Sequence, residues 1–281
     1  MSVITAAEPV VNVHRDPDPA SEVVTQARLG DVADVTERIA PPKAWLRLTF
    51  RHDGYTGWVM ADGFVAGDWP PAGGRLVRIR SLFGNLHAGA GVRTPLLYAA
   101  PLGSPLLRKG EDSEGWIPVE VPGALRAFVQ AGDVCDGASA WSWTDEEGLR
   151  AGLVRQAKAL LGLPYRWGGT TPFGIDCSGF VQLSYRLHGI DLPRDVHDQV
   201  RDPRLRPVPR EDLRPGDLLV FRGASHIGLA VSGREFVHAT TVGSPVVQVN
   251  AVDDHHWAGV RDGFFRVRVV CPRPVRGAVV A

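Results

Sequence analysis

The sequence predicts two small β-barrels followed by a larger domain of the α+β class. Two observations predict this organisation. Short strand-like runs separated by turn residues fill about the first 135 positions, whereas two helical patterns and then five strand-like runs fill the rest. Helices that precede an antiparallel series of strands are typical of α+β folds. We therefore expect domains at 1–70, 71–136 and 137–281.

One hairpin pattern occurs twice in the N-terminal part. AWLRLTF (44–50) and YTGWVM (55–60) flank the turn residues HDG, and a similar pair of runs begins at Trp116 and continues to Phe128. The aromatic residues are 13 positions apart in the first pair and 12 in the second. Such a repeat predicts two barrels of one design.

Turn-rich segments separate the three parts. WPPAGG (69–74) predicts the seam between the barrels, and CDGASAWSW (135–143) predicts the linker to the third domain. Thr144 and Glu147 then form a capping-box pattern, which predicts the start of a helix. The apolar residues of this helix recur at helical spacing: Leu149, Leu153, Ala157, Leu160 and Leu161.

A second helix is predicted from about Cys177 to His188, with Asp176 as the N-cap and Gly189 just beyond the end. One face of this helix is formed by Phe180, Val181, Ser184 and Leu187. The strand-like runs that follow lie at 217–221, 226–231, 235–240, 246–250 and 264–270.

The composition excludes several classes of partner. The 281 residues include 31 basic and 31 acidic ones without long runs of one sign, so we expect no nucleic-acid or membrane-surface partner. No run of apolar residues is long enough for a membrane helix. The N-terminal residues lack a secretory signal pattern, so the expected location is cytoplasmic. The oligomeric state is left open, with a monomer as the default.

The cysteines predict neither a disulfide framework nor a metal centre. Cys135, Cys177 and Cys271 are widely spaced, and no CxxC pair is present. The pair His255 and His256 has no acidic or cysteine partner at a ligand spacing. We therefore expect free thiols and no resident metal.

Cys177 has two possible roles. It could be a small buried hydrophobe, as most unpaired cysteines are. Alternatively, it could be a nucleophile, because the first residue of a helix lies beside unpaired N–H groups and the positive end of the helix dipole. The dipole contributes only about 0.3–1 kcal/mol, which is less than one pKa unit. A neighbouring imidazole must then supply the remaining activation.

His226 is the best candidate for that imidazole, because it opens a strand directly after a turn of small residues. His238 lies near the end of the next strand. A two-residue loop between the strands would put the two histidines on opposite faces of the sheet. A three-residue loop, which Gly233 permits, pairs position 226 with 240 and puts both on one face. His238 could then orient His226, as in a catalytic triad.

Four ordered blocks of the third domain resemble a known family. YRWGG (165–169), DCSGF (176–180), LRPGDLLVF (213–221) and SHIGLAV (225–231) are similar to the NlpC-type cysteine peptidases, which cleave bacterial cell-wall peptides. The resemblance covers essentially all of 144–270 and implies a papain-like α+β fold. It implies no metal and no organic cofactor.

The resemblance also implies roles for single residues. Cys177 would be the nucleophile, His226 its base, and His238 the residue that orients His226. Tyr165 would support the oxyanion. The substrate-binding residues would include Trp167 of the first block and the two residues that flank the nucleophile, Asp176 and Ser178, with Asp176 helping to hold a free α-amino group.

The N-terminal part is similar to bacterial Src-homology-3-like barrels, two of which precede the peptidase in one branch of the family. That branch cleaves γ-D-glutamyl-L-diamino-acid bonds in murein tri- and tetrapeptides with a free N-terminal L-Ala. By position, Asp31 and Tyr55 would be the acidic residue and the tyrosine that close the groove. From the residues alone, Tyr55 could equally belong to the barrel core and Asp31 to a turn.

These observations predict a cysteine endopeptidase that recycles murein peptides. Two alternatives remain open at this stage. The barrels could tether a hydrolase to intact peptidoglycan, or the cysteine scaffold could serve an amidase or acyltransferase. The sequence does not decide whether the diamino acid is diaminopimelate or lysine.

Overall fold

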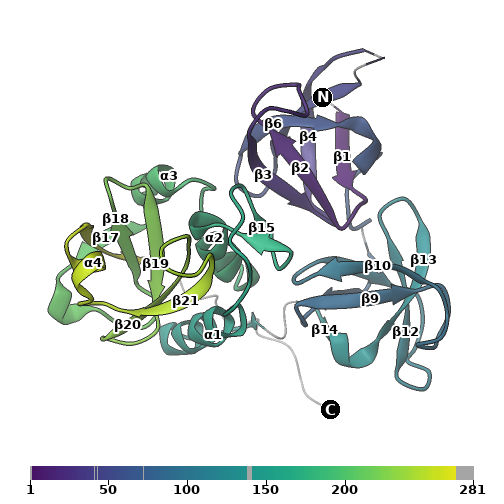
Figure 1. Ribbon diagram of the computed structural model, residues 1–281. Coiled ribbons are helices and arrows are strands. Elements are labelled where there is room, and N and C mark those ends of the chain that lie inside the picture. The colour runs from purple at the N-terminus through teal and green to yellow at the C-terminus, as the bar shows by residue number, and fades with distance from the viewer. Residues whose placement is uncertain (1, 41, 43, 72, 138–140, 270–281) are drawn as a thin grey trace.

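The computed structural model describes residues 2–40, 42, 44–71, 73–137 and 141–269. Cys271 and the last residue of the run 264–270 lie outside the described residues. Figure 1 shows three bodies: two barrels on one side and the third domain on the other. Helix α2 and strand β15 of the third domain face the barrels.

The first barrel is a seven-stranded antiparallel sheet with the order β3-β2-β6-β5-β4-β1-β7. Alternate residues of these strands fill its core, including Val13, Leu48, Phe50 and Val59. The strands are β1 (Ser2–Ala6), β2 (Val10–His14), β3 (Val23–Arg28), β4 (Val32–Arg38), β5 (Trp45–Phe50), β6 (Thr56–Met60) and β7 (Phe64–Ala66).

The second barrel repeats this design. Its strand order, β10-β9-β13-β12-β11-β8-β14, is that of the first barrel with every number raised by seven. An edge-to-face contact between His14 and Trp45 in the first barrel recurs between His87 and Trp116 in the second. The predicted hairpin repeat is therefore confirmed. The strands are β8 (Leu76–Ile79), β9 (Phe83–His87), β10 (Leu96–Pro101), β11 (Pro105–Arg108), β12 (Trp116–Val121), β13 (Leu125–Gln130) and β14 (Val134–Asp136).

The third domain begins with the two predicted helices. In α1 (Glu146–Ala159) the N-cap is Asp145, whose side chain accepts a hydrogen bond from the Gly148 backbone N–H. The predicted capping box at Thr144 is wrong by one residue, because the adjacent aspartate takes the capping position. Helix α2 (Cys177–Leu187) is capped by Asp176 as predicted, and Gly189 follows its end with φ +78°.

A six-stranded antiparallel sheet completes the α+β fold, with the order β17-β22-β18-β19-β20-β21. Both helices pack against one face, and Trp257 of α4 packs against the other. Four features of this domain are not among the elements predicted from the sequence: α3, α4, β17 and the two-stranded sheet of β15 and β16. The bounds are β15 (Thr170–Thr171), β16 (Gly174–Ile175), α3 (Val196–Arg201), β17 (Leu205–Val208), β18 (Leu218–Phe221), β19 (His226–Ala230), β20 (Glu235–Thr240), β21 (Val246–Ala251), α4 (His255–Ala258) and β22 (Arg261–Val267).

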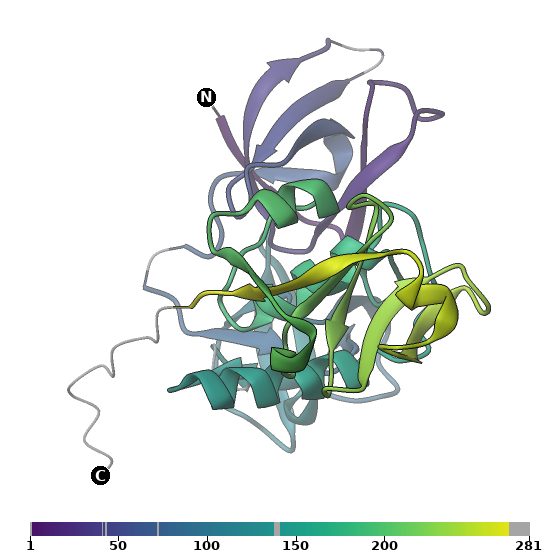
Figure 2. The ribbon, with the colours of Figure 1, turned by 90° about the vertical axis from the view of Figure 1, so that its left-hand side faces the viewer.

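The first barrel docks on the third domain through β3 and the turn after β5. Arg194 donates to Thr25 Oγ1 at 2.9 Å, and Gln182 donates to Asp53 Oδ2 at 2.8 Å. Gly168 has φ +75°, and a Cβ on it would lie 2.4 Å from the Val23 carbonyl oxygen. Only glycine satisfies both conditions without displacing the barrel. Figure 2, seen from the side of the third domain, shows its sheet in front with the first barrel above.

Within the described part of the chain, none of the helices combines the length and apolar character that crossing a membrane requires.

Candidate active site

Cys177 occupies the first position of α2 and is buried. The backbone N–H of Ile227, the residue after His226, acts on its sulfur in the direction that lowers the thiol pKa. Burial raises the pKa of the Cys177 thiol to about 12, and the adjacent Asp176 carboxylate acts in the same direction. Burial thus opposes the effect of the helix start, and the expectation that this position favours the thiolate stays a prediction.

The two histidines lie on one face of the sheet, as the three-residue loop predicted. Leu229 pairs with Val237 and Ala230 with Phe236, a register that continues through the hydrogen bond from the Val231 N–H to the Glu235 carbonyl. His226 Nε2 lies 2.7 Å from His238 Nδ1.

A chain of hydrogen bonds fixes the tautomers of both histidines. Gln248 Nε2 donates to Asn250 Oδ1 at 3.1 Å, and His238 Nε2 lies 3.0 Å from the same oxygen. Because a carbonyl oxygen only accepts, His238 carries its proton on Nε2 and its Nδ1 accepts from His226 Nε2–H. The remaining nitrogen of His226, Nδ1, is therefore the unprotonated one. Asn250 and Gln248 were missed in the sequence analysis, although both lie in the predicted strand at 246–250.

Burial keeps both imidazoles neutral. It lowers the pKa of His226 to about 3, with the proximity of His238 as the second cause, and the pKa of His238 to about 4. The Trp257 ring stacks on His226 with the ring centroids 5.1 Å apart and thereby shields it from water. The site at rest thus contains a thiol at Cys177 and neutral imidazoles at His226 and His238.

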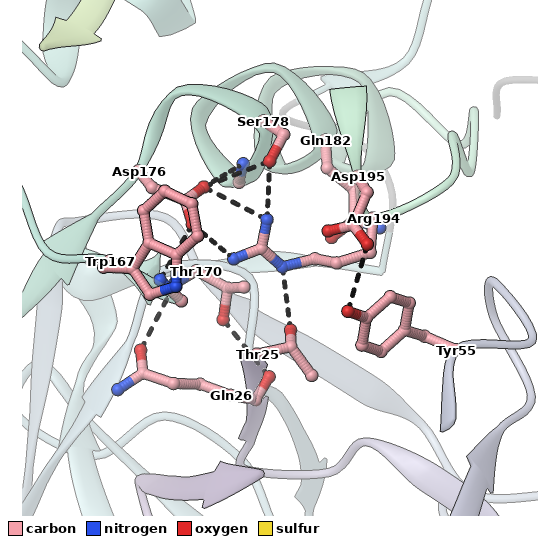
Figure 3. A network of polar contacts seen from close by, with 12 residues as sticks. Thr25, Gln26, Tyr55, Trp167, Thr170, Asp176, Ser178, Gln182, Arg194 and Asp195 are labelled. Carbon is pink, nitrogen blue, oxygen red and sulfur yellow. Dashed lines mark hydrogen bonds and ion pairs between the residues drawn. The ribbon is translucent and has the colours of Figure 1, made fainter. Parts of the chain in front are cut away.

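Arg194 organises the polar network beside the nucleophile (Figure 3). Its guanidinium contacts both Asp176 carboxylate oxygens, at 3.1 and 2.6 Å, and donates to Ser178 Oγ at 2.7 Å. The Asp176 oxygens also accept from the Gly168 and Gly179 N–H groups and from Ser178 Oγ–H. Five donors saturate this carboxylate, and Arg194 neutralises it. The predicted part of Asp176 in holding an ammonium group is therefore not supported.

A groove of about 390 Å³ opens over Cys177 between the third domain and the first barrel. The third domain contributes Tyr165, Trp167, Asp176, Ser178, Asp195, Val196, His197 and the turn Gly223, Ala224 and Ser225. The barrel contributes Arg15, Glu22, Val24 and Tyr55. The structure thus brings the predicted Tyr55, Trp167 and Tyr165 into one groove with Cys177. Figure 3 shows Tyr55 and Trp167 beside the network around Arg194.

Two acidic groups of this groove were missed. Glu22 accepts from Trp167 Nε1 at 2.8 Å and from Arg15 Nε at 2.8 Å. Asp195 accepts one hydrogen bond at Oδ2, from the Tyr55 hydroxyl at 3.1 Å. Burial raises the pKa of Asp195, because its polar neighbours do not fully offset the desolvation of the ionised carboxylate. The position of Asp195 in the block LPRD, shortly after α2, was the available signal.

Asp31 is not part of the groove, and its predicted place there is wrong. Its buried carboxylate accepts from Arg186 Nη2 at 2.6 Å and from the Arg28 backbone N–H at 2.9 Å. Glu22 and Asp31 flank opposite ends of β3, and only the Glu22 end reaches Cys177. Asp31 joins the barrel to the far end of α2 instead.

One group of side chains in the described residues has the spacing of a metal site. Oxygen or nitrogen atoms of Asp195, His197 and Asp198 all lie within 4.8 Å of one another at the groove rim. His197 and Asp198 are exposed, and an exposed cluster of this kind does not by itself indicate a metal.

The fold and the site together define a cysteine peptidase of the α+β class with an N-terminal barrel. The NlpC/P60 family model matches residues 162–266, and the model of the bacterial dipeptidyl-peptidase SH3 domain matches residues 13–64. The chain therefore contains an NlpC/P60 domain, of the cysteine peptidase class, and a bacterial SH3 domain.

Two proteins resemble most of this chain, and a third resembles part of it. Dipeptidyl-peptidase 6 of Lysinibacillus sphaericus is 25% identical over 252 residues, which cover 88% of this chain and 90% of the relative. The γ-D-glutamyl-L-lysine dipeptidyl-peptidase of Bacillus subtilis is 36% identical over 109 residues, which cover 37% of this chain and 36% of the relative. The crystal structure of an NlpC/P60 family protein from Bacillus cereus has the same fold, with a TM-score of 0.79 and 20% identity over 96% of this chain and 100% of that protein.

Proposed function

We propose that this chain is a cysteine endopeptidase that hydrolyses the bond between γ-D-glutamate and the L-diamino acid of short murein peptides with a free N-terminal L-Ala. The observation that carries the proposal is the groove over Cys177, one wall of which is formed by the first barrel. Its volume lies within the range of small-ligand sites. The Lysinibacillus and Bacillus subtilis relatives are named as dipeptidyl-peptidases, which agrees with a groove of small-ligand volume.

Asp195, with the Tyr55 hydroxyl beside it, is the group that best suits a substrate ammonium. Among the residues that the structure describes, the Asp195 side chain has one hydrogen-bond partner, and burial raises its pKa, so a nearby cation would stabilise its ionised form. Glu22 also lies at the barrel wall, but Arg15 already pairs with it at 2.6 Å, so Asp195 is the better partner for an ammonium group. A peptide whose N-terminus is acylated would lose this ion pair and would also have to pass the barrel.

The reaction follows from the thiol and the neutral imidazole. As the Cys177 sulfur attacks the γ-carbonyl carbon, His226 Nδ1 takes the thiol proton. Burial raises the pKa of Tyr165, so its hydroxyl stays protonated and can donate to the oxyanion, together with the N–H groups at the start of α2.

The tetrahedral intermediate then collapses. The C–N bond breaks, and His226 returns its proton to the leaving amine of the diamino acid. Water hydrolyses the resulting thioester with His226 again as the base, which releases the L-Ala-γ-D-Glu dipeptide and restores the thiol. His238 and Asn250 hold His226 in the reactive tautomer throughout.

Substitution of the nucleophile tests this proposal. Cys177→Ala is expected to abolish cleavage of L-Ala-γ-D-Glu-diaminopimelate and of its lysine counterpart while leaving the unfolding transition intact. Cys135→Ala, at a partly buried cysteine of the second barrel, is the matched control and should retain activity. Full activity of Cys177→Ala would overturn the proposal.

We also propose that the enzyme acts in the cytoplasm on wall peptides recovered for recycling, because a requirement for a free α-amino group selects released peptides. Cell fractionation with an antibody to the chain tests this location. Detection of the full-length protein outside the cytoplasmic fraction would contradict it.

A further inference from the structure

A second cavity, of about 330 Å³, lies where the two barrels meet the C-terminal end of α2. Its charged lining comes from all three domains. The basic residues are Arg28 and Arg51 of the first barrel, Arg78 of the second and Arg186 of α2, and the acidic residues are Asp31 and Asp68. The lining therefore carries an excess of two positive charges in a partly desolvated space.

Arg28 is the least satisfied of these groups. It is buried, and its guanidinium faces Asp31 at 3.7 Å without donating a side-chain hydrogen bond to any other residue in the described ranges. Burial lowers the pKa of Arg28 to about 10, and the charges of Arg186 and Arg78 act in the same direction. Burial and Arg186 also lower the pKa of Arg78. Three cations thus repel one another around one space.

The carboxylates nearby are already engaged. Asp31 accepts from Arg186 at 2.6 Å, and Asp68 pairs with Arg51 at 2.7 Å. Asp191 approaches Arg186 at 3.6 Å, but it is half exposed and lines only the adjoining cavity. Internal pairing therefore leaves Arg28 and Arg78 with unused donors.

His52 adds a second, independent observation. Its Nε2 lies 3.3 Å from Asp53 Oδ2, whereas its buried Nδ1 has no hydrogen-bond partner among the residues that the structure describes. His52 lines this cavity together with Arg28 and Arg78. If Asp53 accepts from Nε2–H, Nδ1 is an acceptor that a ligand hydroxyl can satisfy. Monohydrogen phosphate and sulfate differ in this respect, because only the phosphate carries a hydroxyl.

We propose that this cavity is a binding site for a phosphate-type dianion, held by Arg28, Arg78 and Arg186. A divalent oxyanion matches the excess charge, and guanidinium groups bind such oxyanions through paired N–H donors. A lone carboxylate would neutralise only half of that charge. The cavity is larger than inorganic phosphate and adjoins a second one of about 520 Å³, which leaves room for the organic part of a phosphomonoester.

The site is separate from the proposed catalytic groove. Glu22 and Arg28 mark the two ends of β3, about 20 Å apart at the rise of a strand, and Cys177 and Arg186 are about 14 Å apart along α2. A bound anion would contact all three domains and none of the proposed catalytic residues. It should therefore raise the stability of the whole chain.

Calorimetry and thermal unfolding of the full chain test this site, with inorganic phosphate, glycerol phosphate, sulfate and acetate as probes at constant ionic strength. Phosphate or glycerol phosphate should bind saturably and raise the unfolding temperature. Stronger binding of glycerol phosphate would identify a phosphomonoester as the natural ligand, and equal binding would identify phosphate itself.

Arg78→Gln and Arg28→Lys should each weaken binding about tenfold or more, because each removes charge-assisted hydrogen bonds. Arg80→Gln, at an exposed arginine directly after β8, is the matched control and should bind as the wild type does. If Arg28→Lys fails to fold, the binding measured for Arg78→Gln is sufficient to test the proposal. Binding of acetate or sulfate as tight as that of phosphate, unchanged binding by the folded variants, or no saturable binding would overturn the proposal.

Discussion

Removal of the Asn250 side-chain oxygen should slow the reaction, although Asn250 is not among the residues that line the groove. Asn250→Leu keeps the approximate size of the side chain but takes away the oxygen that receives the His238 Nε2 proton. His238 is fully buried, so its Nε2–H would be left without a partner, at a cost of about 1–3 kcal/mol. The alternative tautomer, with the proton on His238 Nδ1, becomes favoured by a similar amount.

The alternative tautomer disables the base. His238 Nδ1–H would donate to His226 Nε2, and the proton of His226 would move to Nδ1, which then cannot accept from the thiol. A bias of about 1–3 kcal/mol corresponds to a decrease of about 5- to 150-fold in the reactive fraction. We expect kcat for the free-amine tripeptide to fall by this factor while KM changes little.

Asn250→Asp is the matched control, because a carboxylate oxygen also accepts from His238. It should stay within a few-fold of the wild type. Steady-state kinetics of the three proteins, with denaturant unfolding to confirm that each is folded, measure the effect. Activity of Asn250→Leu within twofold of the wild type, or an equal loss in Asn250→Asp, would refute the tautomer argument.

Three further predictions concern the thiol, the histidines and the barrel contact. The rate at which iodoacetamide alkylates Cys177, measured by peptide mass spectrometry, should rise about tenfold per pH unit between about pH 6 and 9. The reason is that the raised pKa leaves Cys177 as a thiol at rest. A rate that does not change with pH would instead indicate a preformed thiolate–imidazolium pair. The fold favours the neutral forms of His226 and His238, whose pKa values are lowered from the ordinary histidine value of 6.5. The protein should therefore lose stability as the pH falls from 6.5 toward 4, because the unfolded chain binds protons at these histidines first. The unfolding free energy of His238→Gln should therefore decline less steeply over this window than that of the wild type, by up to about 1.4 kcal/mol per pH unit, and equal slopes would contradict the assignment. Gly168→Ala should raise KM by displacing the barrel. Gly162 has a similar positive φ but open space around it, so Gly162→Ala should leave KM unchanged. Equal KM values for the two variants would show that the barrel contact does not shape the groove.

The sequence predicted the parts of this site that depend on local rules. Helix capping places Cys177 at the start of α2, and side-chain alternation with a three-residue loop places His226 beside His238. Aromatic spacing alone predicted the repeated hairpin. Each of these features is decided within about fifteen residues, where chain geometry leaves few alternatives.

The parts that failed depend on contacts between distant segments. Whether Glu22 or Asp31 reaches the groove depends on which end of β3 docks beside Cys177, and both acidic residues look alike in the sequence. The neutralisation of Asp176 requires Arg194, which lies 18 residues later and is also anchored by Thr25 of the barrel. The pKa of Cys177 follows from burial, which depends on the packing of the whole domain.

Comparison of a free-amine tripeptide with its N-acetylated form tests the central claim most directly. Purified full-length enzyme would be incubated with L-Ala-γ-D-Glu-diaminopimelate and with the acetylated peptide, and the products would be identified by mass spectrometry. We predict rapid release of L-Ala-γ-D-Glu and free diaminopimelate from the first peptide and far slower cleavage of the second. Equal rates for the two peptides, or cleavage at a different bond, would contradict the account.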